Sequence, residues 1–160
     1  MPRLTAILLE SQLIGPLRAA ANEAGIALDV FLLHQFDENA LRASVRQADA
    51  VFGGVLNVHD PVMRVASILQ EERPSTVILF HSQVEALALT RIGDFDASQP
   101  TWREAVAALR EAGAPLPGRL NVLLAALPRV EGLLPAGRFE GLRQYARASR
   151  LWTEGPVASL

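Results

Sequence analysis

Short apolar runs alternate with amphipathic segments along the first 93 residues. Four of these runs are rich in Val, Ile, Leu and Phe and carry almost no charge, which is typical of strands buried on both faces. We predict strands at residues 4–9, 26–33, 49–56 and 76–80. The intervening segments space their apolar residues as helices do, and we predict helices at residues 12–24, 38–47 and 61–69 and a fourth after Ser82.

Capping residues support these helix boundaries. Asp37 and Asp60 each precede a predicted helix and are expected to cap it. Ser82 and Glu85 have the spacing of a capping box, and Gly93 is expected to end the fourth helix. The order is therefore strand, helix, strand, helix throughout this part of the chain, which favours parallel strands joined by right-handed crossovers.

This alternation predicts an α/β fold. We expect a three-layer, Rossmann/flavodoxin-like parallel sheet of about four strands, with helices on both faces. A helical C-terminal extension is expected to follow it. The stretch 113–118 is rich in Pro and Gly and reads as a linker, so we expect an α/β domain at residues 1–113 and the extension at 114–160.

The second part of the chain has a different character. Thr101 and Glu104 predict a capped helix that runs to Ala112. Residues 120–127 are apolar on nearly every side, and a last helix at about 139–152 has a broad apolar face with Tyr145 and Trp152. Because a long apolar face on a monomer usually marks an interface, we expect residues 120–134 and this face to need a partner surface.

The composition excludes several functions. All 15 basic residues are arginine, so the chain has neither the lysine of a Walker A loop nor an amine for Schiff-base chemistry. A phosphoacceptor receiver domain also needs a lysine and is excluded. There is no cysteine and therefore no disulfide or thiolate metal site. The patterns G-x-G-x-x-G, G-x-S-x-G and H-E-x-x-H are absent, and the loop after the first strand matches a flavodoxin phosphate loop poorly.

Charge is unevenly distributed along the chain. Residues 1–100 hold seven Arg against twelve acidic residues, whereas residues 101–160 hold eight Arg against five Glu. The basic part is better explained as a solvated helix face than as a nucleic-acid site, because no aromatic residues interleave with it.

Hydropathy and the N-terminal sequence lead us to expect a soluble, cytoplasmic protein. No apolar run approaches the ~18 residues of a membrane span, and the first residues lack a signal-peptide pattern.

Polar residues follow each predicted strand. Glu10 follows the first strand, His34 the second, His59 the third and His81 the fourth. Ligands of open α/β sheets bind at this carboxyl edge, and neutral imidazoles can ligate a metal or the metal of a tetrapyrrole. These four residues are therefore the candidate cofactor-binding cluster, although loop histidines are also common without any such role.

Two further groups have structural interpretations. Gly53 and Gly54 lie inside a strand pattern, and we favour close packing of a helix over a bulge or ligand contact as their explanation. Arg91 and Asp94 flank Gly93, and we favour their pairing at the end of the fourth helix over a surface that a partner protein recognises.

Three segments together resemble a known family. They read A-D-A-V-F-G-G-V-L (48–56), L-T-R-I-G-D-F-D-A-S-Q-P (89–100) and L-P-R-V-E-G-L-L-P-A-G-R-F-E-G-L-R-Q-Y (127–145). In this order and spacing the chain is similar to the N-terminal domain of the large H subunit of magnesium chelatase, to which the large subunit of cobalt chelatase is related. The likeness covers most of the chain from about Ala48 onward. The motifs are not catalytic signatures.

The resemblance implies a tetrapyrrole enzyme. In that family the large subunit binds protoporphyrin IX, and two partner subunits, one an AAA+ ATPase, drive ATP-dependent insertion of Mg²⁺ on the way to chlorophyll or bacteriochlorophyll. The large subunit is several times longer than this chain, so the remainder of that subunit would be a partner. The metal-insertion residues of the family belong to its later part, so neither a catalytic residue nor a cofactor is expected on this domain.

Two alternatives remain open from the sequence. The chain could be a stand-alone module that binds a tetrapyrrole or metal at the carboxyl edge of its sheet. It could also be an interaction domain that forms homo-oligomers through its apolar C-terminal helices, in which case Leu123→Glu should disrupt the oligomer.

Overall fold

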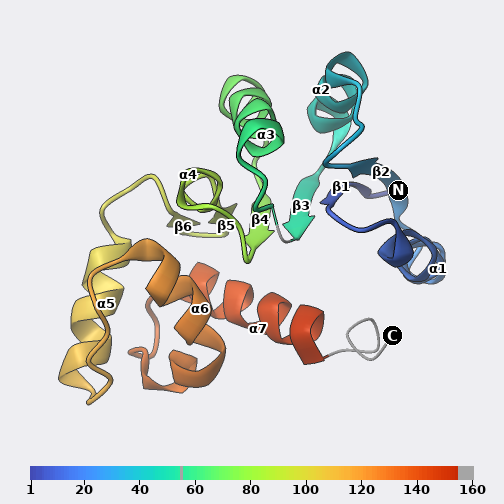
Figure 1. Ribbon diagram of the computed structural model, residues 1–160. Coiled ribbons are helices and arrows are strands. Elements are labelled where there is room, and N and C mark those ends of the chain that lie inside the picture. The colour runs from blue at the N-terminus through green and yellow to red at the C-terminus, as the bar shows by residue number, and fades with distance from the viewer. Residues whose placement is uncertain (55, 155–160) are drawn as a thin grey trace. The chain divides into compact units, whose positions relative to one another are not determined.

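The computed structural model describes residues 1–54 and 56–154 and divides the chain into two compact units, residues 1–89 and 90–160 (Figure 1). The division falls before the predicted domain boundary at 113/114. Residues 113–118 join two helices of the second unit instead. Val55 of the third predicted strand and residues 155–160 of the predicted extension lie outside the described residues.

The first unit is an α/β unit with a parallel sheet. Its strands are β1 (Arg3–Leu8), β2 (Ala27–Leu32), β3 (Ala50–Gly54) and β4 (Val77–Phe80). Its helices are the 3₁₀ helix η1 (Ser11–Leu13), α1 (Ile14–Glu23), α2 (Glu38–Gln47), α3 (His59–Glu72) and the short α4 (Val84–Leu87). The strand order is β2-β1-β3-β4, and all three pairings are parallel.

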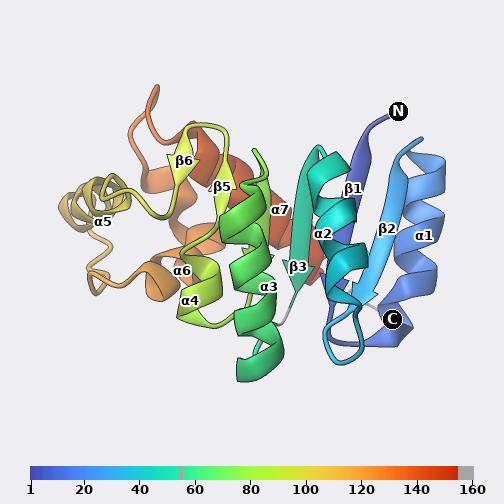
Figure 2. The same ribbon diagram turned by 90° about the horizontal axis from the view of Figure 1, so that it is seen from above.

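Helices cover both faces of this sheet, as the sequence predicted. Helix α1 lies on one face, and α2 and α3 lie side by side on the other (Figures 1 and 2). The central strand β1 is buried along Thr5–Leu8 without alternation, which is the pattern of a strand covered on both sides. The predicted three-layer α/β class is therefore confirmed, and the order β2-β1-β3 places a topological switch point between β1 and β3.

The second unit is a hairpin with helices. Strands β5 (Arg91–Ile92) and β6 (Phe95–Asp96) pair in antiparallel fashion around Gly93 and Asp94. They are followed by α5 (Trp102–Glu111), α6 (Leu120–Val130), the 3₁₀ helix η2 (Glu131–Leu133) and α7 (Glu140–Glu154). The hairpin is new relative to the sequence prediction, which carried a helix through to Gly93.

One predicted cap is confirmed and three are wrong. Asp37 Oδ1 accepts a hydrogen bond from Ala40 N at 2.7 Å and caps α2. Helix α3 begins at His59 with Val58 before it, so Asp60 lies inside its first turn. Ser82 does not cap α4, and Thr101 makes no side-chain cap to α5. The N-cap of α4 is Gln83, one residue after Ser82. Thr101 does hold the N-cap position of α5, but its backbone is already helical, with φ −58° and ψ −25°, instead of the extended conformation of a side-chain cap.

Packing explains Gly53 in β3. A Cβ at this position would lie 2.7 Å from Leu79 Cδ2 and 2.8 Å from Leu56 Cδ1. Contacts of this length do not occur for real side chains, so the glycine leaves room for two core leucines that are fully buried. Close packing was the favoured explanation, although leucine side chains rather than a helix approach the glycine.

Candidate functional site

The carboxyl edge of the parallel sheet holds the four residues that the sequence singled out. Glu10 follows β1 and His59 opens α3 after β3, so these two flank the switch point between neighbouring strands. His34 follows the outer strand β2, and His81 follows β4. Three inter-strand spacings separate β2 from β4, which amounts to ~14 Å.

The histidines therefore do not form one compact ligand set. All three are exposed. Among residues 1–54 and 56–154, no group of three His, Asp or Glu side chains is placed to hold a metal ion. The carboxylate of Glu10 accepts a hydrogen bond from Gln12 Nε2 in its own loop. His59 and His81 are the two histidines that follow neighbouring strands at this edge, because β3 and β4 are adjacent.

Hydrogen bonds join the loops that carry His59 and His81. Gln83 N donates to Leu56 O, and Gln83 Nε2 donates to Asn57 O, both at 3.0 Å. Gln83 Oε1 lies 3.3 Å from His59 Nδ1. Ser82 Oγ accepts a hydrogen bond from Leu56 N at 3.3 Å and donates one to Phe80 O at 2.9 Å. The hydroxyl group that was expected to cap α4 therefore bonds the neighbouring strand ends instead. The two loops are thus held as one surface.

This surface has two features that are unusual for a plain loop pair. His81 adopts φ +48°, a left-handed conformation that non-glycine residues take rarely and that often marks a functional position. Val58 and Val84 are exposed on the same two connections, at 37% and 52% of the residue surface. The His59–His81 surface, defined by Val58, His59, His81, Gln83 and Val84, is therefore the first candidate site.

In the second unit, the tip of the β5–β6 hairpin packs against the first turn of α7. A Cβ at Gly141 would collide with the backbone oxygen of Ile92 and would lie 2.6 Å from the backbone nitrogen of Phe95. Only glycine allows α7 to approach the hairpin so closely. Gly93, with φ +58°, makes the turn itself, so it serves a hairpin and not the helix end that the sequence suggested.

Asp94 binds the end of α7 and not Arg91. Its Oδ1 accepts a hydrogen bond from Gly141 N at 2.6 Å, which satisfies a backbone donor that has no partner within the helix. A carboxylate at this end also complements the helix dipole. Arg91 Nε instead lies 3.5 Å from Asp96 Oδ2 across the hairpin. The predicted pairing of Arg91 with Asp94 is wrong because both lie on a hairpin and not at a helix end.

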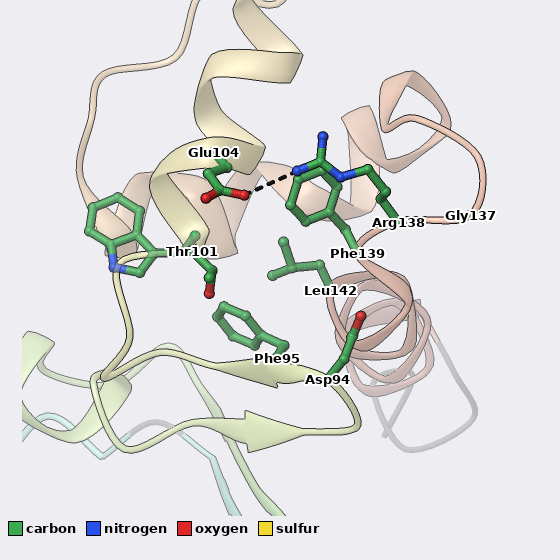
Figure 3. Close-up of a pocket in the computed structure, with 9 residues that line it drawn as sticks. Asp94, Phe95, Thr101, Glu104, Gly137, Arg138, Phe139 and Leu142 are labelled. Atoms are coloured by element: carbon green, nitrogen blue, oxygen red, sulfur yellow. Dashed lines mark hydrogen bonds and ion pairs between the residues drawn. The ribbon is translucent and has the colours of Figure 1, made fainter.

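A pocket of about 260 Å³ opens beside this contact, between the hairpin, α5 and the start of α7 (Figure 3). Its apolar lining comes from Phe95, Trp102, Phe139 and Leu142. Its charged lining comes from Asp94, Glu104 and Arg138. Arg138 Nη2 lies 3.0 Å from Glu104 Oε2, and its guanidinium sits 4.7 Å from the centre of the Phe139 ring.

The loop that carries Arg138 is fastened by Arg143 of α7. The Arg143 guanidinium donates to the carbonyl oxygen of Leu134 at 3.0 Å and also to those of Pro135 and Arg138. Phe139, which leads into α7, has φ +60°, which is strained for an aromatic residue. The pocket wall is thus held in shape by α7 and not by the Arg138 side chain itself.

The apolar C-terminal helices are largely covered within this chain. The side chains of Leu123 and Leu127 on α6 are fully buried, and Tyr145 on α7 is 2% exposed. Burial raises the pKa of the Tyr145 phenol. The expectation that residues 120–134 and the Tyr145 face need an outside partner is therefore wrong for most of these side chains. Leu133 and Leu151 are the large apolar residues of α6, η2 and α7 that remain exposed.

Sequence reasoning found the first site and missed the second. Histidines at strand ends follow directly from the strand pattern. The pocket depends on Phe95 and Glu104 being brought to Arg138 and Phe139, which lie more than 30 residues later. The one signal present in the sequence was the pair of short motifs around Gly93 and Gly141.

Comparison with known families assigns the chain to a family without an established activity. The model of the family "Domain of unknown function (DUF3479)" matches residues 3–146, and the chain belongs to this family. No curated protein matches the chain. Within the described ranges 1–54 and 56–154, no helix is both long and apolar enough to cross a membrane.

Proposed function

We propose that the chain is the N-terminal domain of the porphyrin-binding large subunit of an ATP-dependent magnesium chelatase, which inserts Mg²⁺ into protoporphyrin IX. Its partners would then be the remainder of that subunit, the AAA+ ATPase and the second partner subunit, all in the cytoplasm. Mg²⁺, ATP and the porphyrin act at the level of the whole enzyme, which forms nitrogen–metal bonds. This domain would gate or dock and would make no bond itself.

One observation carries the proposal. The two most distinctive segments of the resemblance, 89–100 and 127–145, meet at the contact of Gly141 with the hairpin. Their glycines and Asp94 serve backbone packing and helix capping, which suits a scaffold role better than acid–base chemistry. The family match at residues 3–146 spans both segments.

Disruption of the gene in the source cells tests the proposal. A chelatase subunit predicts that protoporphyrin IX accumulates and that its magnesium complex disappears, as measured by chromatography of extracted pigments. The intact gene supplied in trans is the control and should restore the pigment. Unchanged tetrapyrrole levels would contradict the proposal.

A second candidate function rests on the His59–His81 surface. Exposed valines beside two imidazoles suit a stand-alone module that binds a tetrapyrrole or its metal. Titration with protoporphyrin IX and its zinc complex should then show saturable binding that His59→Ala and His81→Ala each weaken. His34→Ala is the matched control, because His34 is exposed at the far strand β2 and should have no effect. Homo-oligomerisation through α6 is less favoured, since Leu123 is fully buried.

A further inference from the structure

One wall of the pocket in the second unit is formed by a guanidinium group. The guanidinium of Arg138 pairs with Glu104 and stacks on Phe139 (Figure 3). Guanidinium groups favour this combination of a carboxylate and an aromatic face. The contacts of Arg138 therefore show that Glu104 and Phe139 together accommodate a guanidinium group.

The lining of the pocket carries more negative than positive charge. Asp94 and Glu104 place two carboxylates in the lining, against the single guanidinium of Arg138. Phe95, Trp102 and Phe139 add three aromatic side chains, and Trp102 and Phe139 are only half-buried. Such a lining attracts a planar cation and disfavours an anion.

The size of the pocket indicates a side chain and not a cofactor. Its volume of about 260 Å³ lies below the ~300–1,000 Å³ of most small-molecule sites. An extended side chain that carries a guanidinium at its tip is of the right order.

Arg138 can leave its place without disturbing the pocket. The side chains of Arg138 and Glu104 are 57% and 61% exposed, and exposed ion pairs contribute little to stability. The loop itself is held by Arg143, through three backbone carbonyl groups. An incoming arginine can therefore replace Arg138 on Glu104 while the wall stays in place.

We propose that this pocket is a docking site for an arginine side chain presented by a partner protein, which displaces Arg138 of the lining from Glu104. The incoming guanidinium pairs with Glu104 and stacks on Phe139. This inference is independent of the chelatase proposal, because it follows from the pocket alone.

The test uses the whole 160-residue chain with Trp152→Phe, which leaves Trp102 as its one tryptophan. N-acetyl-arginine methylamide is titrated while Trp102 fluorescence is followed, and the neutral isostere N-acetyl-citrulline methylamide is the ligand control. We expect saturable binding of the arginine compound only. Arg138→Ala should tighten it by roughly threefold to tenfold, because the competing guanidinium is removed, and Glu104→Gln should weaken it by roughly tenfold.

Arg103→Ala is the control variant, since Arg103 lies over the Trp102 ring but is not part of the pocket lining. Its affinity for the arginine compound should stay unchanged. Equal responses to the arginine and citrulline compounds, no saturable binding, or affinities that do not move in opposite directions in Arg138→Ala and Glu104→Gln would each overturn the proposal. Circular dichroism of each variant verifies that these exposed substitutions leave the fold intact.

Discussion

At the scale of single residues, backbone contacts explain the most distinctive positions of the chain. Gly141 lets α7 touch the hairpin, and Asp94 caps the helix at the same point. Gly53 makes room for two buried leucines. At both glycines an added methyl group would collide with backbone or core atoms, so neither position accepts a larger residue without a shift of its neighbours.

Gly141→Ala should destabilise the protein by about 1–3 kcal/mol, because the new methyl group meets hairpin backbone that cannot move aside. Urea unfolding followed by circular dichroism measures the change. Gly15→Ala is a matched control, since Gly15 is likewise the second residue of a helix, with nothing within 4 Å of its Cβ position. It should range from neutral to about 1 kcal/mol more stable. An equal effect of the two substitutions would contradict the proposed hairpin contact.

At the scale of elements, strand and helix positions follow from the apolar pattern, whereas the hairpin does not. Residues 91–96 carry Arg, Asp and Gly in a short stretch that reads equally well as a helix end. Only the contact with α7, about 45 residues later, decides between the two. The predicted cap at Ser82 is wrong because contacts outside its own segment decide its role. Ser82 has the spacing of a helix cap, but its hydroxyl group bonds Phe80 O and Leu56 N at neighbouring strand ends.

Arg143→Ala should release the loop that precedes α7. The substitution leaves three carbonyl groups without their donor, one of them from the buried Leu134, and should cost about 1–3 kcal/mol. Arg143→Lys should recover little of this, because an ammonium lacks the planar fork of donors. The control is Arg147→Ala on the exposed side of the same helix, and its unfolding midpoint should stay close to that of the wild type. A wild-type unfolding midpoint for Arg143→Ala would contradict this role.

Helices α2 and α3 are joined by ion pairs whose contribution should depend on pH. Hydrogen bonds from Arg46 and then Arg42 lower the pKa of Glu72 below its ordinary value of 4.5. A carboxyl group with a lowered pKa stabilises the fold above about pH 4.5 and loses this contribution as the pH falls through its folded-state pKa. The difference in unfolding free energy between wild type and Glu72→Gln should therefore be largest near pH 7 and shrink toward pH 3.

Glu38→Gln is the comparison for this experiment, because Glu38 makes a single pair with Arg64 at 3.5 Å. Its effect near pH 7 should be smaller than that of Glu72→Gln. A difference for Glu72→Gln that is constant from pH 7 to pH 3 would show that the pairs between α2 and α3 do not stabilise the folded state.

At the scale of the whole molecule, the α/β class was predictable and the division into units was not. Four alternating strands and helices specify a parallel sheet almost by themselves. The boundary at residues 89/90 could not be read from composition, because it depends on the hairpin and α5 packing with α6 and α7. The candidate sites follow the same rule. The histidines of the first unit are visible along the sequence, whereas the pocket lined by Glu104, Arg138 and Phe139 forms only when the second unit folds.

The size of the native gene product tests the chelatase proposal most directly. An antibody raised against this chain is used to probe a blot of the source cells, with the purified 17.3 kDa chain as a marker. A band several times larger than 17.3 kDa, lost on disruption of the gene, is the predicted result for the N-terminal domain of a chelatase large subunit. A single band near 17.3 kDa would contradict that assignment and leave a free-standing binding protein.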